Sequence, residues 1–302
     1  MPRLRPWTRR TAIGGVALAN ALLLSVAMTP WSTSMAGAAT TTPAFYLDLG
    51  ASVSVGVQPT PTAPRGHPTI HGYANDLVAM ASTNGVSLAL TQLGCPGESI
   101  DTFIHGGDRC YTGSDTQLSD ALAFLRAHSN QTGLVTIDLG FNTINPCFDG
   151  LSFDATCLSQ KFATIQPQLS QVVASLKAAA GPNVTFVGVG HYDPFYASAL
   201  GGASGQLFAA ASVDVMRTLN DVLQSVYSSS NVPFARVAEA FSDHAKAVVP
   251  RTNGVTATGN VAAACTLTWM CAPAPFGPNI HPTDAGYQVI AKAISALIPS
   301  SL

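Results

Sequence analysis

A serine in a turn of small residues is the first candidate for chemistry in this sequence. The turn reads Gly50-Ala51-Ser52-Val53-Ser54-Val55-Gly56 and directly follows an apolar run, residues 44–49, that is typical of a buried strand. A serine in such a turn can act as a nucleophile. Ser54 lies two residues further into the turn, which aims its side chain elsewhere, so we assign the role to Ser52.

Acyl transfer by a serine also requires a base and hydrogen-bond donors for the oxyanion. We select His281 as the base, because it stands in a loop just before the last amphipathic helix, where it can return to the edge of a sheet. The backbone N–H groups of Ser52 and Gly97 and the side-chain amide of Asn142 are the expected oxyanion donors. Nucleophile and base lie 229 positions apart, so the fold must bring them together.

Alternating strand and helix patterns predict the scaffold for these groups. Apolar runs typical of strands lie at 44–49, 86–93, 134–139, 184–189 and 234–237. Helical patterns lie between and after them, at 72–81, 118–125, 165–176, 215–226 and 287–297. The alternation predicts a three-layer α/β/α domain with a central parallel sheet of about five strands. With the order 2-1-3-4-5, the loops that contain Ser52, Gly97 and Asn142 meet at one edge.

The first 38 residues have the pattern of a secretion signal. Arginines precede an apolar segment at 12–28, and Ala36-Gly37-Ala38 is a small-residue cleavage site. We therefore expect a signal peptide at 1–38, cleavage near Ala38, and an exported domain at 39–302. The pair Arg9-Arg10 leaves twin-arginine export open. The alternative is an uncleaved membrane anchor, for which the apolar segment is short and interrupted.

Composition and charge limit the partners of the exported domain. The chain has 302 residues, of which 47% are hydrophobic and 10% charged, so it can bury a large core. Removal of 38 residues with four arginines and no acid leaves 10 basic and 16 acidic side chains, a formal charge of minus six. That charge disfavours nucleic-acid binding. We expect no transmembrane segment after residue 39, and nothing in the sequence indicates a cofactor, a metal or an oligomeric state.

Six cysteines occur, all in the exported part, and an even number in an oxidising compartment predicts disulfides. The sequence alone permits many pairings. Nearest-neighbour pairing is favoured, because each pair then brackets one loop-like stretch: Cys95 with Cys110, Cys147 with Cys157, and Cys265 with Cys271. A zinc site is the alternative, although the Cys-x-x-Cys spacing of such sites does not occur.

Four motifs together resemble a known family, the secreted actinobacterial branch of the SGNH (GDSL-type) hydrolases. The family's first block is similar to Gly50–Gly56, and the glycine of the family's second block matches Gly97. The third block resembles Gly140-Phe141-Asn142-Thr143, and the histidine block resembles residues 281–287, His-Pro-Thr-Asp-Ala-Gly-Tyr. The stretches 192–195 and 268–271 also look like this branch.

The resemblance implies a flavodoxin-like fold, ester hydrolysis without a metal, and three local disulfides. Three positions depart from the family pattern: Ala51 replaces an aspartate that supports the turn, Thr143 replaces the last residue of the third block, and Pro278 replaces the aspartate that orients the histidine. We expect Thr143 to loosen the loop that aims Asn142. We also expect a backbone carbonyl from residues 269–278 to orient His281 instead.

Other functions remain open from the sequence. The same departures are compatible with an inactive secreted protein that binds cell-wall or carbohydrate ligands. An α/β-hydrolase is disfavoured because no Gly-x-Ser-x-Gly motif occurs. Asp48 and Asp76 could be considered as a glycosidase pair, but we expect solvent-facing or sheet-end roles for them. Among esters, lipid esters, short-chain esters and acetylated sugars all remain possible substrates, because the loops at 58–71, 144–156 and 243–264 have no readable specificity pattern.

Overall fold

A five-stranded parallel sheet forms the middle layer of the fold. The computed structural model describes residues 43–243, 249–250, 256–257, 259–299 and 302. The sheet strands are β1 (Ala44–Gly50), β4 (Leu88–Gln92), β5 (Gly133–Asp138), β8 (Val184–Val189) and β9 (Phe234–Ala235). Their spatial order is β4-β1-β5-β8-β9, with every neighbouring pair parallel. The three-layer fold and the 2-1-3-4-5 order are therefore confirmed.

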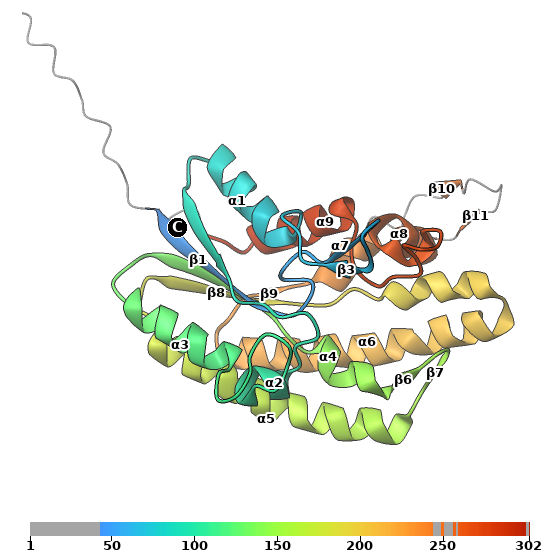
Figure 1. Cartoon of the computed structure of the whole chain (residues 1–302), viewed down its shortest axis with the longest axis horizontal. Coiled ribbons are helices and arrows are strands. Elements are labelled where there is room, and N and C mark those ends of the chain that lie inside the picture. Colours follow the sequence, from blue (N-terminus) through green and yellow to red (C-terminus); the bar gives the residue numbers. More distant parts are fainter. Residues whose placement is uncertain (1–42, 244–248, 251–255, 258, 300–301) are drawn as a thin grey trace, which may run out of the picture. The chain divides into compact units, whose positions relative to one another are not determined.

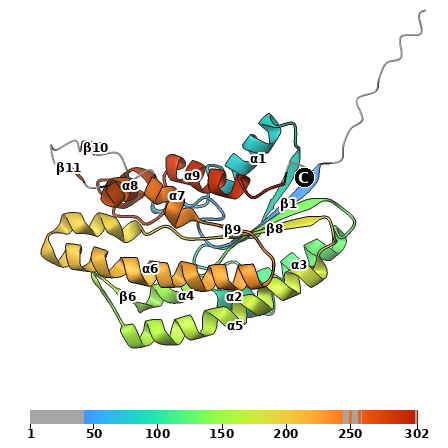
Figure 2. The same cartoon turned by 180° about the vertical axis from the view of Figure 1, so that it is seen from behind.

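Helices cover both faces of the sheet (Figures 1 and 2). One face carries α3 (Gln117–Ala127), α5 (Ala155–Ala179) and α6 (Ala203–Ser229), and the other carries α1 (Tyr73–Thr83), α7 (Val237–Asp243), α8 (Gly259–Leu267) and α9 (Asp284–Ser295). Successive side chains of a strand point to opposite faces. Accordingly, Tyr46 packs in the cluster with Ile290, whereas Leu47 packs in the cluster with Leu219. Because both faces are covered, all seven residues of β1 are buried.

Several short elements lie outside the strands and helices that the sequence predicts. Segment 58–71 contains the hairpin β2 (Gln58–Thr60) and β3 (Ala63–His67), and segment 144–156 contains the hairpin β6 (Phe148–Asp149) and β7 (Ser152–Phe153). The others are α2 (Ile100–His105), α4 (Phe141–Ile144), β10 (Val249–Pro250), β11 (Thr256–Ala257) and the 3₁₀ helices η1 (Asn145–Cys147), η2 (Pro194–Gly201) and η4 (Trp269–Cys271). Most of these elements are shorter than two helical turns, so they leave no clear periodicity in the sequence.

The three disulfides join nearest neighbours along the chain, which confirms the favoured pairing. They are Cys95–Cys110, Cys147–Cys157 and Cys265–Cys271. The six cysteines all lie in the described part of the chain and all are paired, so none supplies a thiolate for zinc. The Cys95–Cys110 bond closes a loop of 15 residues, which on the chain-entropy model contributes about 3 kcal/mol.

The predicted signal peptide, residues 1–38, and its cleavage position near Ala38 lie outside the described residues. Within the described ranges, each helix is too short or too polar to span a bilayer.

Gly50, the last residue of β1, provides a test of how the sheet edge is built. Its φ is +146°, and a β carbon there would lie 2.4 Å from the Asp138 carbonyl oxygen. We expect Gly50→Ala to lower the free energy of unfolding by about 3 kcal/mol, because strain and overpacking add. Gly85→Ala is the control: its φ is +79°, but no atom lies within 4 Å of an added β carbon, so only backbone strain of about 1 kcal/mol is expected. Urea denaturation measures both losses, and equal losses would contradict the explanation.

Candidate active site

One pocket at the carboxyl edge of the sheet contains three of the predicted functional residues. Ser52 follows β1, Asn142 follows β5, and His281 lies in the loop before α9; all three line this pocket. The fold therefore brings together a hydroxyl and an imidazole that are 229 positions apart in the chain. This edge, beyond the carboxyl ends of parallel strands, is where open α/β sheets bind ligands.

The turn that carries Ser52 is held by its own backbone. The Val57 N–H donates to the Ser52 carbonyl at 2.9 Å, and the Gly56 N–H donates to the Val53 carbonyl at 3.2 Å. Ser54 is fully buried, its hydroxyl donates to the Ala51 carbonyl at 2.8 Å, and it does not line the pocket. Ser52 is partly exposed in the pocket, and no other group in the described chain hydrogen-bonds to its hydroxyl. The Ser52 hydroxyl is thus available to a ligand.

Hydrogen bonds hold the backbone at His281 and at the residue before it. The Trp269 N–H donates to the His281 carbonyl at 3.0 Å, and the Tyr192 hydroxyl donates to the Ile280 carbonyl at 2.7 Å. Thr283 caps α9 by accepting from the Gly286 N–H at 3.3 Å, so the helix begins directly after the His281 loop. These contacts set the direction in which the imidazole enters the pocket.

The side chain of Asn279, rather than a backbone carbonyl, contacts Nδ1 of His281. The Asn279 Oδ1 atom lies 2.7 Å from the ring Nδ1 and also accepts the His281 backbone N–H at 3.0 Å. The expectation of a backbone carbonyl from residues 269–278 is therefore wrong. The loop turns back, so that Asn279, two positions before the histidine, reaches its ring. The replacement of the family's aspartate by Pro278 gave no indication of this contact.

Two backbone groups also fix which way the Asn279 amide faces. The His281 N–H can only donate, and it points to Oδ1; the Arg65 carbonyl can only accept, and it receives Asn279 Nδ2 at 3.2 Å. Because Oδ1 can only accept, Nδ1 of His281 must carry the ring proton. Nε2 then has a free lone pair. This Nδ1–H tautomer is the form of the ring that a general base needs.

Burial keeps this imidazole uncharged. Loss of solvent around the ring lowers the pKa of His281 to about 4, because burial disfavours the charged form. Asn279 is neutral and provides no negative charge to oppose this effect. The ring is therefore a neutral acceptor at any pH well above 4.

The segment that carries Asn142 is tied to its neighbours. Gly140, at the N-terminus of α4, has φ +133°, and its carbonyl accepts the Thr143 N–H at 3.0 Å. The Thr143 hydroxyl accepts the Ile100 N–H at 3.1 Å, so it joins α4 to the start of α2. Thr143 therefore ties this loop rather than loosening it. Gly97 has φ +97° and is exposed beside the pocket, which its neighbour Glu98 lines.

Three buried polar residues of the pocket were not identified from the sequence: Glu98, Asp138 and His191. Nε2 of His191 lies 3.2 Å from the Leu139 carbonyl, its Nδ1 lies 3.6 Å from Asp138 Oδ1, and burial lowers its pKa to about 4. Burial also raises the pKa of Asp138 well above its usual value. Asp138 and His191 stand at the carboxyl ends of β5 and β8, so the rule that selected Ser52 and Asn142 would have found them.

Asp48 and Asp76 do not belong to this pocket. Asp48 is fully buried within the sheet, where it accepts hydrogen bonds from Tyr73 and Thr136, both at 2.7 Å, and burial raises its pKa to about 7. The expected solvent-facing or sheet-end position is therefore wrong for Asp48, whose carboxyl cross-links the sheet to α1. Asp76 lies partly buried in α1.

Comparison with known proteins agrees with this fold. The model of the GDSL-like lipase/acylhydrolase family matches residues 49–289, so the chain belongs to that family. An extracellular lipase from Streptomyces rimosus is similar at 19% identity, with 84% of this chain and 100% of the lipase covered and a TM-score of 0.54. A phospholipase A1 from Streptomyces albidoflavus is similar at 17% identity, with 84% and 99% covered and a TM-score of 0.55.

An acetylxylan esterase from Geobacillus stearothermophilus, studied as a catalytic mutant, is similar at 14% identity, with 84% of this chain and 94% of the esterase covered and a TM-score of 0.53. A comparison with curated protein sequences gave no match. At these identities the solved structures show a shared fold, and the family membership shows a hydrolase.

The contact between Asn279 and His281 makes a measurable prediction. In the native protein the NMR signals of the His281 ring should titrate near pH 4. Asn279→Asp places a carboxylate at Nδ1, so the pKa of His281 should rise by about 1 to 3. Asn279→Leu removes the contact without adding charge and should produce no such rise. An unchanged pKa in Asn279→Asp would show that residue 279 does not contact the ring in solution.

Proposed function

We propose that this chain is a secreted serine carboxylic-ester hydrolase in which Ser52 is the nucleophile and His281 the base. The observation that carries the proposal is the neutral His281 ring, held by Asn279 in the pocket that also contains the partly exposed Ser52 hydroxyl. In this proposal Ser52, His281 and Asn279 act as the nucleophile, the base and the group that orients the base.

In the proposed reaction, Ser52 Oγ attacks the ester carbonyl carbon while Nε2 of His281 takes the hydroxyl proton. The resulting oxyanion accepts hydrogen bonds from the backbone N–H groups of Ser52 and Gly97 and from the Asn142 amide. Collapse of the tetrahedral intermediate breaks the bond to the alcohol, which leaves with the proton from His281. Water then attacks the acyl-enzyme by the same route and releases the acid. These steps require no metal or cofactor.

Replacement of the orienting carboxylate by Asn279 has a chemical consequence. An amide oxygen holds the Nδ1–H tautomer, but it stabilises the imidazolium formed during attack less than a carboxylate does. The neutral orienter is compatible with catalysis, and it accounts for the absence of an aspartate three residues before His281.

The substrate of the proposed enzyme is a small-molecule or lipid ester. The apolar part of the pocket is formed by Val53, Phe141, Tyr192, Pro194 and Ile280, which suits an acyl chain. The solved structures of similar fold include a lipase, a phospholipase A1 and an acetylxylan esterase, so the class of ester is left to assay.

Export of the protein is the second part of the proposal. Three disulfides in a chain with a signal-like start favour an oxidising compartment outside the cell. Similarity in fold to an extracellular lipase from Streptomyces agrees with export and with the actinobacterial branch.

Replacing the nucleophile tests the reaction directly. Ser52→Ala should lower kcat for short-chain 4-nitrophenyl esters by about 10⁴-fold or more, because the acyl-enzyme can no longer form. Ser54→Ala is the matched control in the same turn and should keep activity within about tenfold, since Ser54 only bonds the Ala51 carbonyl. Circular dichroism checks that both variants fold. Turnover that survives in Ser52→Ala would exclude Ser52, and a folded protein inactive on a broad ester panel would favour the binding-protein alternative.

The pH dependence follows from the lowered pKa of His281. Only the unprotonated ring can accept the serine proton, so kcat/KM should fall as pH decreases through about 4. Between pH 5 and 7 the rate should be nearly constant, whereas a histidine with the reference pKa of about 6.5 would make kcat/KM fall within this range. A pH–rate profile on 4-nitrophenyl acetate measures the fall in kcat/KM, and a midpoint near the reference pKa would contradict the described burial of His281.

A further inference from the structure

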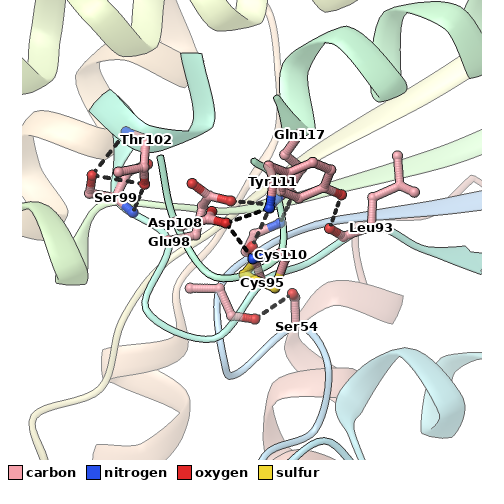
Figure 3. Close-up of a disulfide and its surroundings, with 12 residues drawn as sticks. Ser54, Leu93, Cys95, Glu98, Ser99, Thr102, Asp108, Cys110, Tyr111 and Gln117 are labelled. Carbon is pink, nitrogen blue, oxygen red and sulfur yellow. Dashed lines mark hydrogen bonds between the residues drawn. A yellow bond between two sulfur atoms is a disulfide. The ribbon is translucent and has the colours of Figure 1, made fainter. Parts of the chain in front are cut away.

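A second network of polar groups supports the loop beside the Ser52 turn. Glu98 follows Gly97, is completely buried and lines the pocket, and it lies close to the Cys95–Cys110 disulfide (Figure 3). Its backbone N–H donates to the Cys95 carbonyl at 3.0 Å, which closes the turn that contains Gly97. Its carboxyl extends to two partners, one on α3 and one in the disulfide loop.

The partner on α3 is Gln117, which is also completely buried. Gln117 Nε2 donates to Glu98 Oε2 at 2.9 Å and to the Gly50 carbonyl at 3.0 Å. Its Oε1 accepts the Gly50 N–H at 2.7 Å. One amide therefore links Glu98 to the end of the strand that carries Ser52.

The partner in the disulfide loop is Asp108. Its Oδ1 accepts the Cys110 and Tyr111 N–H groups, both at 2.7 Å. Its Oδ2 and the Glu98 Oε1 atom are buried and find no donor among the described residues. Burial, and after it the neighbouring Asp108 carboxyl, raise the pKa of Glu98 to about 8. Two facing carboxyl oxygens can share a hydrogen bond only when one of the two groups carries a proton.

We propose that Glu98, in its protonated form, is a positioning residue that holds the Gly97 N–H in the oxyanion site. Its proton bridges Oε1 to Oδ2 of Asp108, while Oε2 accepts from Gln117. The loop is thereby tied at once to the disulfide loop and to the strand before Ser52. Glu98 acts through Gly97, so this inference rests on the proposed esterase function for its kinetic consequence but not for its structural one.

Loss of the bridging proton to solvent leaves two adjacent carboxylates. Tyr111 in the disulfide loop lies near both carboxyl groups and near Asp120 of α3, and on the pocket side Asp138, His191 and His281 line the same cavity as Glu98. Both histidines have pKa values near 4 and are neutral above pH 6, so none of these groups offsets the new charge. Repulsion between like charges in a buried site then opens the contact and releases the Gly97 loop.

The kinetic test compares kcat/KM on 4-nitrophenyl acetate from pH 6 to pH 10, corrected for spontaneous hydrolysis. The native enzyme should lose about tenfold by pH 9, as expected for a single deprotonation. Glu98→Gln should keep the activity at pH 7 and lack this alkaline loss, because its amide donates to Asp108 and accepts from Gln117 at every pH. Glu239→Gln is the control, since Glu239 is exposed beside Arg236 and should keep the native profile.

Glu98→Ala breaks both contacts and should lower kcat at every pH, and the Gln variant should restore it. The same alkaline loss in native protein and Glu98→Gln would overturn the proposal. A second readout does not depend on activity: the NMR signal of the Gly97 amide should shift with a midpoint near pH 8 in native protein and not in Glu98→Gln. A shift common to both proteins, or absent from both, would overturn the proposal even if the chain proved not to hydrolyse esters.

Discussion

The parallel pairing of β1 with β5 is the constraint on which the site depends. Gly50 lies opposite Asp138 at the last register position of this pair, so the two strands end together and the segments after them leave the sheet side by side. One segment carries Ser52 and the other carries Asn142. The approach is close because Gly50 has no side chain: a β carbon there would meet the Asp138 carbonyl. The missing side chain therefore sets the spacing between the proposed nucleophile and the proposed amide donor.

Around this edge, burial keeps the polar groups neutral. It lowers the pKa of His281 to about 4 and raises the pKa of Glu98 to about 8 and that of Asp138 well above its usual value. Between pH 5 and 7 the pocket thus combines an uncharged His281 imidazole with a protonated Glu98 carboxyl. Asn279 orients the ring through a neutral amide oxygen, so it adds no charge beside His281.

The sequence was sufficient for the sheet order and for the expectation that Ser52 and His281 lie at one edge of the sheet, because long apolar runs and chain punctuation are local signals. It was insufficient for Asn279, whose role depends on a loop that turns back and on the Arg65 carbonyl of a distant hairpin. It was also insufficient for Glu98. Nothing near that residue in the sequence shows that its carboxyl is buried between two other elements of the fold. Local patterns therefore predicted the scaffold, whereas contacts made through the tertiary fold determined the protonation states.

The most direct measurement is a crystal structure of the protein after reaction with diethyl 4-nitrophenyl phosphate, whose phosphoryl group imitates the tetrahedral intermediate. We expect phosphorus bonded to Ser52 Oγ, with the phosphoryl oxygen about 2.7–3.1 Å from the Gly97 backbone nitrogen and Asn142 Nδ2. His281 should remain bound to Asn279 through Nδ1, with Nε2 directed at the modified serine. Phosphorus on another residue, or a phosphoryl oxygen turned away from Gly97 and Asn142, would contradict the proposed nucleophile and oxyanion site.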